Sequence, residues 1–204
     1  HTQYSICEGA IKIDDLANYC KINKIKAIGL ADSYNLCGAL EFAEKISKVG
    51  TQPIIGSQIN IKIDNLMGKL PIFASTEEGY KNLTKLSSTS YLEGEASSDP
   101  FCRMENLIEN SDGLILLSGN VYGLFGQLFK LNKLDLIEKL LKKLNNIFPG
   151  NFYIEIQRHL ENEEKNYEDF LISLSSKLDI PIISSQEVFY INEEMAEAHD
   201  ALIC

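Results

Sequence analysis

Short apolar runs alternate along this chain with longer stretches in which apolar residues recur at helical spacing. Runs of the first kind are typical of buried strands, and stripes of the second kind are typical of amphipathic helices. The predicted strands cover residues 26–31, 53–63, 70–74, 113–119, 152–157 and 180–184. The predicted helices cover residues 12–22, 40–50, 76–86, 104–109, 134–144 and 167–174, with a final helix from about residue 193. A turn at 64–69 and a Ser- and Glu-rich loop at 87–100 separate some of them.

Strands that alternate with helices favour an α/β fold with a parallel sheet, because a helix is the usual crossover between parallel strands. His1 lies where a further strand, just before the first residue, would end. We therefore predict a parallel, barrel-like sheet. In such barrels reactive groups gather at the carboxyl ends of the strands. The polar residues at the predicted strand ends are His1, Asp32, Ser33, Gln58, Ser118, Asn120, His159, Gln186 and Glu187.

Length and composition indicate one soluble domain over residues 1–204. A chain of 204 residues that is 45% hydrophobic and 24% charged is long enough to bury one sizeable core. No apolar run approaches the roughly 20 residues that span a bilayer, and no signal segment is evident. Five widely spaced cysteines without a Cys-x-x-Cys pair fit reduced thiols. We expect a cytoplasmic protein.

The charge of the chain argues against nucleic-acid binding by this segment alone. The formal net charge is −10, and the only arginines, Arg103 and Arg158, lie far apart in the sequence. Affinity for phosphate comes from clustered Lys and Arg, which neutralise the backbone. The three lysines at 139, 142 and 143 flank a helical stripe and are interpreted as a solvated face.

Two polar blocks near the N-terminus carry a family resemblance. The first is His1-Thr2-Gln3-Tyr4-Ser5 followed by Glu8-Gly9, and the second is Ala31-Asp32-Ser33-Tyr34-Asn35. They resemble the opening of the polymerase and histidinol phosphatase (PHP) domain, in which a His-x-His-Ser-x-Tyr-Ser pattern precedes an acidic residue and a Thr-Asp-His-x-x-Asn block follows. The resemblance implies a distorted, TIM-like barrel of about seven strand–helix units, in agreement with the predicted sheet.

Further blocks are similar to the branch of the family found in bacterial DNA polymerase III alpha subunits. They are Glu-Glu-Gly-Tyr-Lys-Asn-Leu at 77–83 and Glu-Ala-His-Asp at 197–200. The resemblance implies an N-terminal fragment excised from a larger polymerase subunit, whose Mg²⁺-binding polymerase carboxylates would follow Cys204. It also implies two partners, the rest of the alpha subunit and a separate proofreading exonuclease subunit.

Active members of the family bind up to three metal ions, Zn or Mn, and cleave phosphoester bonds with a metal-activated water. The resemblance implies that this chain has lost most of the ligands. Ser33 stands for a histidine, Gln58 for a glutamate, Lys69 for a histidine, Asn120 for a cysteine and Phe189 for a histidine. The retained or conservatively replaced positions are His1, Glu8, Asp32, His159 and Glu187.

Two functions remain open at this stage. The first is a non-catalytic domain with no metal, which supports the polymerase and docks the exonuclease; Lys69 would then pair with Glu8 or Glu187 in place of an ion. The alternative is a 3'-5' exonuclease or pyrophosphatase that works with a reduced site, in which a single ion is held by His1, Glu8, His159 and Glu187. His199 is interpreted as a packing or capping residue.

Overall fold

The computed structural model describes residues 1–93, 99–159 and 163–203. The chain divides into two compact units. The first consists of His1–Gln58 and Glu187–Cys204, and the second of Ile59–Gln186. The long strand β2 (Gln52–Ile63) contributes its first residues to one unit and its last residues to the other.

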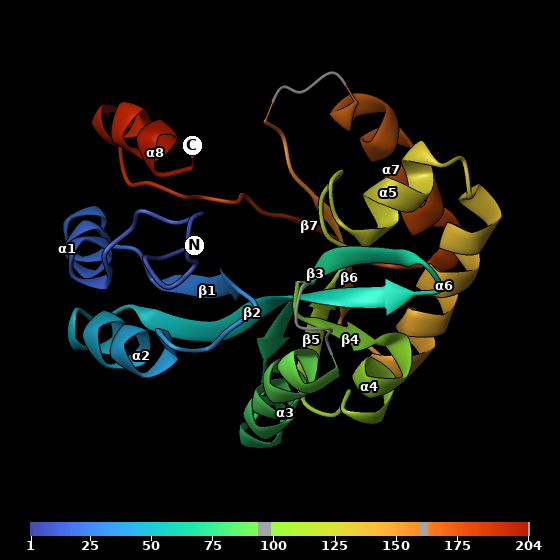
Figure 1. Ribbon diagram of the computed structural model, residues 1–204, viewed down its shortest axis with the longest axis horizontal. Coiled ribbons are helices and arrows are strands. Elements are labelled where there is room, and N and C mark those ends of the chain that lie inside the picture. Colours follow the sequence, from blue (N-terminus) through green and yellow to red (C-terminus); the bar gives the residue numbers. More distant parts are fainter. Residues whose placement is uncertain (94–98, 160–162, 204) are drawn as a thin grey trace. The chain divides into compact units, whose positions relative to one another are not determined.

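The first unit combines α-helices and a short 3-10 helix with a pair of parallel strands (Figure 1). Strand β1 pairs with the first half of β2 in a register that runs from Ala27 opposite Gln52 to Ser33 opposite Gln58. The end of β1, with Asp32 and Ser33, therefore lies beside Gln58 in the middle of β2. The other elements of this unit are α1 (Ile13–Asn23), β1 (Ala27–Ser33), α2 (Ala39–Lys48), a short 3-10 helix (Glu193–Met195) and α8 (Ala196–Ile203).

Helices α1 and α2 form because their apolar residues fall on one face at helical spacing. One hydrophobic cluster contains Ile13 and Cys20 of α1, Phe42 and Ile46 of α2, and Leu30 of β1. Each of the four helical residues is at most 1% exposed. Burying such side chains contributes about 1.5–3 kcal/mol each. The predicted helices at 12–22 and 40–50 are thus confirmed to within two residues at each end.

The second unit is a sheet with helices packed against it. Its strand order is β2-β3-β5-β6-β7, and β4 pairs with β2. The pairs β2–β4, β5–β6 and β6–β7 are parallel, whereas β3 and β5 are antiparallel. The elements are β3 (Leu66–Ala74), α3 (Glu77–Glu93), β4 (Phe101–Arg103), α4 (Met104–Glu109), β5 (Leu114–Leu117), α5 (Leu124–Lys130), α6 (Leu134–Ile147), β6 (Phe152–Ile156), α7 (Glu164–Leu178) and β7 (Ile182–Ser184).

The expectation of a wholly parallel sheet is wrong at β3. Only Asp64 and Asn65 separate β2 from β3, and Asp64 has a φ of 51°. Two residues suffice for a tight turn but not for the crossover that a parallel connection needs. The predicted turn at 64–69 is correspondingly too long, and Lys69 lies within β3.

Three other expectations differ from the structure. Helix α3 continues to Glu93, so the loop predicted at 87–100 is helical in its first part, and residues 94–98 of that loop lie outside the described residues. The short elements β4 and α5, of three and seven residues, have no counterpart among the predicted elements. The remaining elements of the second unit match the predictions apart from their ends.

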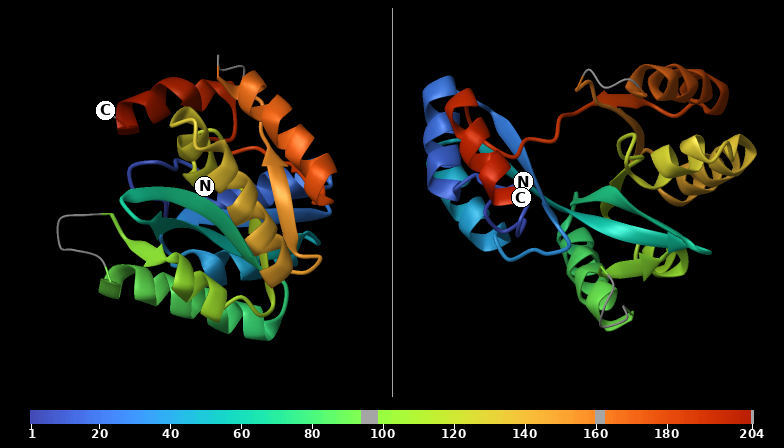
Figure 2. Two further views of the ribbon diagram at one scale, coloured as in Figure 1. Left: turned by 90° about the vertical axis from the view of Figure 1, so that its right-hand side faces the viewer. Right: turned by 45° about the horizontal axis from the view of Figure 1, so that its top comes forward.

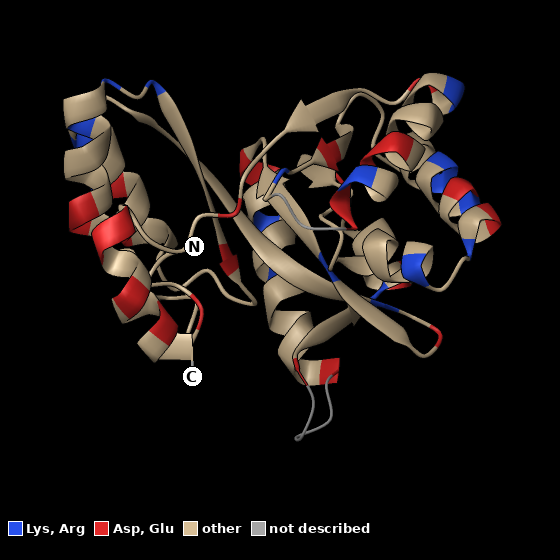
Figure 3. Ribbon diagram, turned by 90° about the horizontal axis from the view of Figure 1, so that it is seen from above, with Lys and Arg blue, Asp and Glu red and all other residues tan. Residues whose placement is uncertain are grey.

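Helices α6 and α7 lie side by side in the second unit (Figure 2), and Lys177 of α7 pairs with Glu138 of α6 at 2.7 Å. Lysines and acidic residues are mixed on α6, as expected for a solvated face, whereas the charged residues on α8 are all acidic (Figure 3). Among the described helices, none is long and apolar enough to cross a membrane.

Two glycines let α3 approach the turn before β5. A Cβ added to Gly79 would overlap the carbonyl oxygen of Gly113, and Gly113 itself has a φ of 69°.

Gly79→Ala should therefore lower the free energy of unfolding by about 3 kcal/mol, because the backbone must move. Gly150→Ala is the matched control. Its φ of 74° is also positive but open space surrounds it, so its cost should be only about 1 kcal/mol. Urea unfolding measures both, and equal losses would contradict the steric argument.

Candidate functional site

A buried carboxylate, Asp32, organises the polar residues of the first unit. It lies at the end of β1 and is 1% exposed. The backbone N–H of Thr2 donates to its Oδ1 at 2.6 Å, the Thr2 hydroxyl to its Oδ2 at 2.8 Å, and the Ser5 hydroxyl to its Oδ1 at 2.7 Å. Hydrogen bonds to a charged acceptor are roughly twice as strong as neutral ones. Asp32 therefore anchors the N-terminal segment to the strand end.

His1 is held through Ser5. The single hydroxyl proton of Ser5 goes to Asp32, so the Nδ1–H of His1, 3.1 Å from the Ser5 Oγ, is the donor in that contact. The His1 Nε2 lies 3.4 Å from Oε1 of Glu187, and the His1 side chain is only 3% exposed. Phe189 stacks on the imidazole at 4.6 Å between ring centroids. The position predicted to have lost a histidine thus packs against the histidine that remains.

Two positions predicted to have lost a metal ligand donate hydrogen bonds to acidic residues. The Ser33 hydroxyl donates to Oε2 of Glu8 at 2.5 Å. The side-chain amide of Gln58 donates to Oε1 of Glu187. Hydroxyl and amide are weak metal ligands, whereas both are good donors to carboxylates. Ser33 and Gln58 thus each satisfy one oxygen of Glu8 and of Glu187.

His199 of α8 fastens the loop that carries Glu8. Its Nε2 lies 2.7 Å from the Glu8 carbonyl oxygen, which can only accept, so Nε2 is protonated. The ring also packs against Phe189 and Tyr190, with centroids 5.8 and 5.3 Å away. His199 therefore has a packing and hydrogen-bonding role in the first unit.

Tyr4 ties the same loop to α2. Its hydroxyl donates to Glu41 at 2.6 Å, and Lys45 pairs with Glu41 at 2.7 Å and with Asp14 at 2.6 Å. The hydrogen bond from Lys45, followed by that from Tyr4, holds the pKa of Glu41 below its usual range. Bonds to Asp14 and Glu41 raise the pKa of Lys45 to about 12. Gly38 is required here because a Cβ would meet the Tyr4 ring at 2.6 Å.

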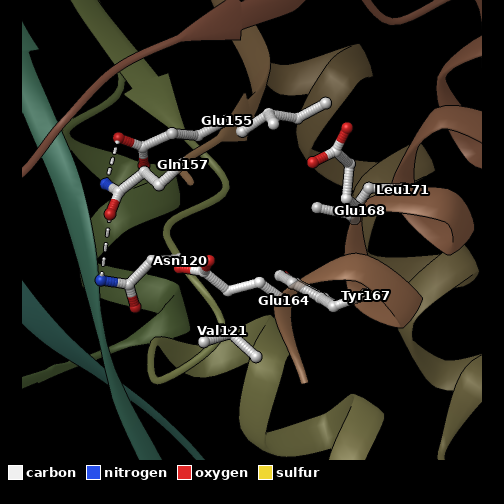
Figure 4. A pocket seen from close by; sticks show the side chains of 9 residues that line it. Asn120, Val121, Glu155, Gln157, Glu164, Tyr167, Glu168 and Leu171 are labelled. Atoms are coloured by element: carbon white, nitrogen blue, oxygen red, sulfur yellow. Dashed lines mark hydrogen bonds between the residues drawn. The ribbon is translucent and has the colours of Figure 1, made fainter. Parts of the chain in front are cut away.

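In the second unit, Asn120 and His159 meet through Gln157. Gln157 Oε1 lies 3.5 Å from Asn120 Nδ2 and 3.3 Å from His159 Nε2 (Figure 4 draws the first contact). The Gln157 amide donates to Glu155 at 3.0 Å and to Ser185 at 3.2 Å. Glu155, Gln157 and Ser185 are not among the site residues that the sequence predicts. The available signal is the pair of polar residues, Glu155 and Gln157, that lie two apart at the end of the predicted strand 152–157.

The predicted site residues divide between the two units. The first unit contains His1, Glu8, Asp32, Ser33, Gln58, Glu187 and Phe189, and the second contains Lys69, Asn120 and His159. A pairing of Lys69 with Glu8 or Glu187 stays a prediction. Within residues 1–93, 99–159 and 163–203, no group of three or more His, Cys, Asp or Glu side chains is arranged to hold a metal ion.

Comparison with known proteins shows to which protein family the chain belongs. The family model for the PHP domain matches residues 1–159, and the chain belongs to this family. Solved structures with the same fold include a protein from Bifidobacterium adolescentis provisionally assigned as a metal-dependent phosphoesterase (TM-score 0.56, 9% identity, 96% of this chain and 92% of that one). Another is an amidohydrolase from Chromobacterium violaceum (TM-score 0.53, 8% identity, 96% and 93% covered). The predicted α/β fold of the PHP type is thereby confirmed.

Within the family, the chain matches the N-terminal region of DNA polymerase III alpha subunits. It is 36% identical to that of Rickettsia felis over 204 residues, 34% to that of Caulobacter vibrioides over 213 and 30% to that of Vibrio cholerae over 203. These alignments cover 100%, 98% and 98% of this chain but only 17%, 18% and 18% of the relatives. The chain thus spans less than a fifth of their length.

Replacing the Asp32 carboxylate by an amide tests its role as an anchor. Asp32→Asn removes the charge and turns one acceptor into a donor that faces Thr2 or Ser5, so the free energy of unfolding should fall by about 2 kcal/mol. Asp15→Asn, at an exposed position in α1, should change it by less than about 0.5 kcal/mol. Chemical unfolding of both variants measures the difference. If Asp32→Asn left the free energy of unfolding unchanged, the three donors would have to find other partners, and the anchor role would be contradicted.

Proposed function

We propose that this chain is the N-terminal PHP domain of a DNA polymerase III alpha subunit, and that it acts as a single domain in DNA replication in the cytoplasm. The similarity over nearly the whole chain to three alpha subunits supports this assignment. The nucleotidyltransferase chemistry of the subunit, with its Mg²⁺, then belongs to the part of the protein that this chain does not span.

We propose further that the domain has no phosphoesterase activity and binds no catalytic metal. The observation that carries this proposal is that Ser33 and Gln58 donate hydrogen bonds to Glu8 and Glu187. A metal-activated water requires ions held by imidazole and carboxylate. Here the carboxylates accept hydrogen bonds from neutral donors, and Phe189, at a position where the family resemblance implies an imidazole, offers only a phenyl ring that stacks on His1. The residues present in the first unit therefore do not fit a multinuclear cluster.

The remaining positions extend the same proposal. Asn120 Oδ1 accepts from the N–H groups of Tyr122 and Gly123 at 2.9 and 3.0 Å, which occupies the oxygen in a turn. Lys69 brings a fixed positive charge, which disfavours a nearby cation. We propose that Lys69 substitutes for an ion as the partner of the acidic residues, so that the degenerate site remains electrostatically balanced.

One observation favours the alternative, a metal-dependent exonuclease or pyrophosphatase with a reduced site. The His1 imidazole remains beside two carboxylates, with Nδ1 3.9 Å from Glu8 and Nε2 3.4 Å from Glu187. Together with His159 these residues are the possible ligands of a single ion. The alternative function predicts a bound metal ion and metal-stimulated turnover, whereas the non-catalytic function predicts neither.

Metal analysis and activity assays separate the two functions. The chain purified without chelator should carry well under one equivalent of Zn, Mn or Fe. It should hydrolyse single-stranded DNA, pyrophosphate and p-nitrophenyl phosphate no faster than a His159→Ala, Glu187→Ala double variant, because the ligands for a reactive ion are lacking. Metal-stimulated turnover that disappears in the double variant would establish the alternative.

The role that remains for a non-catalytic domain is support and docking. We propose that it contacts the rest of the alpha subunit and binds the proofreading exonuclease subunit, and that it binds neither membrane nor nucleic acid by itself. The net charge of −10 supports the last point, because it repels phosphate.

Docking is tested with purified components. The 204-residue chain and the exonuclease subunit of the same organism should co-elute on size exclusion, whereas each alone should elute at its own volume. Titration calorimetry should give a micromolar or tighter Kd. If titration calorimetry detects no heat of binding and the two proteins elute separately at micromolar concentrations, docking through this domain is contradicted. The family assignment does not depend on this result.

A further inference from the structure

A small pocket lies between β6 and the first turns of α7 in the second unit (Figure 4). Its volume is about 10 Å³, close to the room that one water molecule needs. Polar walls come from Asn120, Glu155, Gln157 and Tyr167, and apolar walls from Val121 and Leu171. The pocket is distinct from the acidic residues of the first unit.

The hydroxyl of Tyr167 is the unusual group in this pocket. Tyr167 is only 4% exposed, and its hydroxyl makes no hydrogen bond to any described residue. A buried hydroxyl without a partner is costly, because it has given up its hydrogen bonds to water. Nearly all such groups in folded proteins are satisfied by protein or by ordered water.

Glu155 provides an acceptor near this hydroxyl. Its carboxylate is 3% exposed and accepts from Gln157 at 3.0 Å and from the Ser185 hydroxyl. Burial, and then the charge of Glu155, raise the pKa of Tyr167 well above its ordinary value. The Tyr167 hydroxyl therefore keeps its proton and is available as a donor.

The other carboxylates that line the pocket have strong partners elsewhere. Both oxygens of Glu164 accept from the backbone N–H of His159, at 3.0 and 2.8 Å. Glu168 pairs with Arg158 through two bonds, at 3.0 and 2.6 Å. Arg158 therefore neutralises Glu168, and the backbone of His159 satisfies Glu164, so neither carboxylate is the acceptor that the Tyr167 hydroxyl needs.

We propose that this pocket binds one internal water molecule, which accepts a hydrogen bond from the Tyr167 hydroxyl and donates to the Glu155 carboxylate. The water joins α7 to the end of β6 and so helps to position the segment that carries Gln157 and His159. This role does not depend on whether the domain is catalytic.

Removing the Tyr167 hydroxyl gives results of opposite sign for a hydrated and a dry pocket. With the water bound, Tyr167→Phe loses the bridge and should lower the melting temperature of the 204-residue chain by about 3 to 6 °C. In a dry pocket the same variant removes an unsatisfied group, so the melting temperature should rise or stay constant. The matched control is Tyr153→Phe, whose hydroxyl donates to Gly150 at 3.2 Å at an exposed position, and it should shift melting by no more than about 2 °C.

Two further measurements decide the identity of the ligand. A crystal structure that resolves ordered solvent should show one density peak within hydrogen-bonding distance of both the Tyr167 hydroxyl and Glu155. Exchange of Na⁺ for K⁺ or choline at constant ionic strength should leave the melting temperature unchanged, because a neutral water is bound. Any of three results would overturn the proposal. They are a melting temperature of Tyr167→Phe that rises or stays constant, the absence of the density peak, and a melting temperature that depends on the cation.

Discussion

The burial of one carboxylate governs the first unit. Asp32 is 1% exposed, and it is stabilised by three donors from the first five residues of the chain. A buried charge must be satisfied in this way or it becomes strongly unfavourable. Because the donors come from Thr2 and Ser5, satisfying Asp32 also determines where His1 lies. The geometry of the acidic residues around His1 depends on this anchor.

Around that anchor, neutral side chains contact the carboxylates that the family resemblance identifies as ligand positions. A metal ion and a hydrogen-bond donor both lower the energy of a buried carboxylate, but a neutral donor does not supply the Lewis acidity with which an ion activates water. Ser33 and Gln58 provide the donors, and Phe189 covers one face of His1. The acidic residues of the first unit are therefore satisfied by side chains of the protein itself.

Much of the fold follows from the sequence pattern. The stripe of Ile13 and Cys20 predicts α1, and the alternating residues near Ile59 and Ile61 predict β2, because burial of one face imposes the period of each element. The antiparallel strand β3 could not be derived from its own apolar residues. Its direction comes from the short turn at Asp64 and Asn65, and recognising that turn would have corrected the sheet and moved Lys69 into the strand.

The sequence by itself determined which chemical groups are available. Ser33 offers a hydroxyl and Phe189 a phenyl ring whatever the fold, since ligand strength is a property of the side chain. Only the tertiary structure decided which groups meet. Ser33 and Glu8 are 25 residues apart, and Gln58 and Glu187 are 129 apart, so no local period relates them. Their contacts arise because β1 ends beside Gln58 of β2 and the chain returns to this place at Glu187.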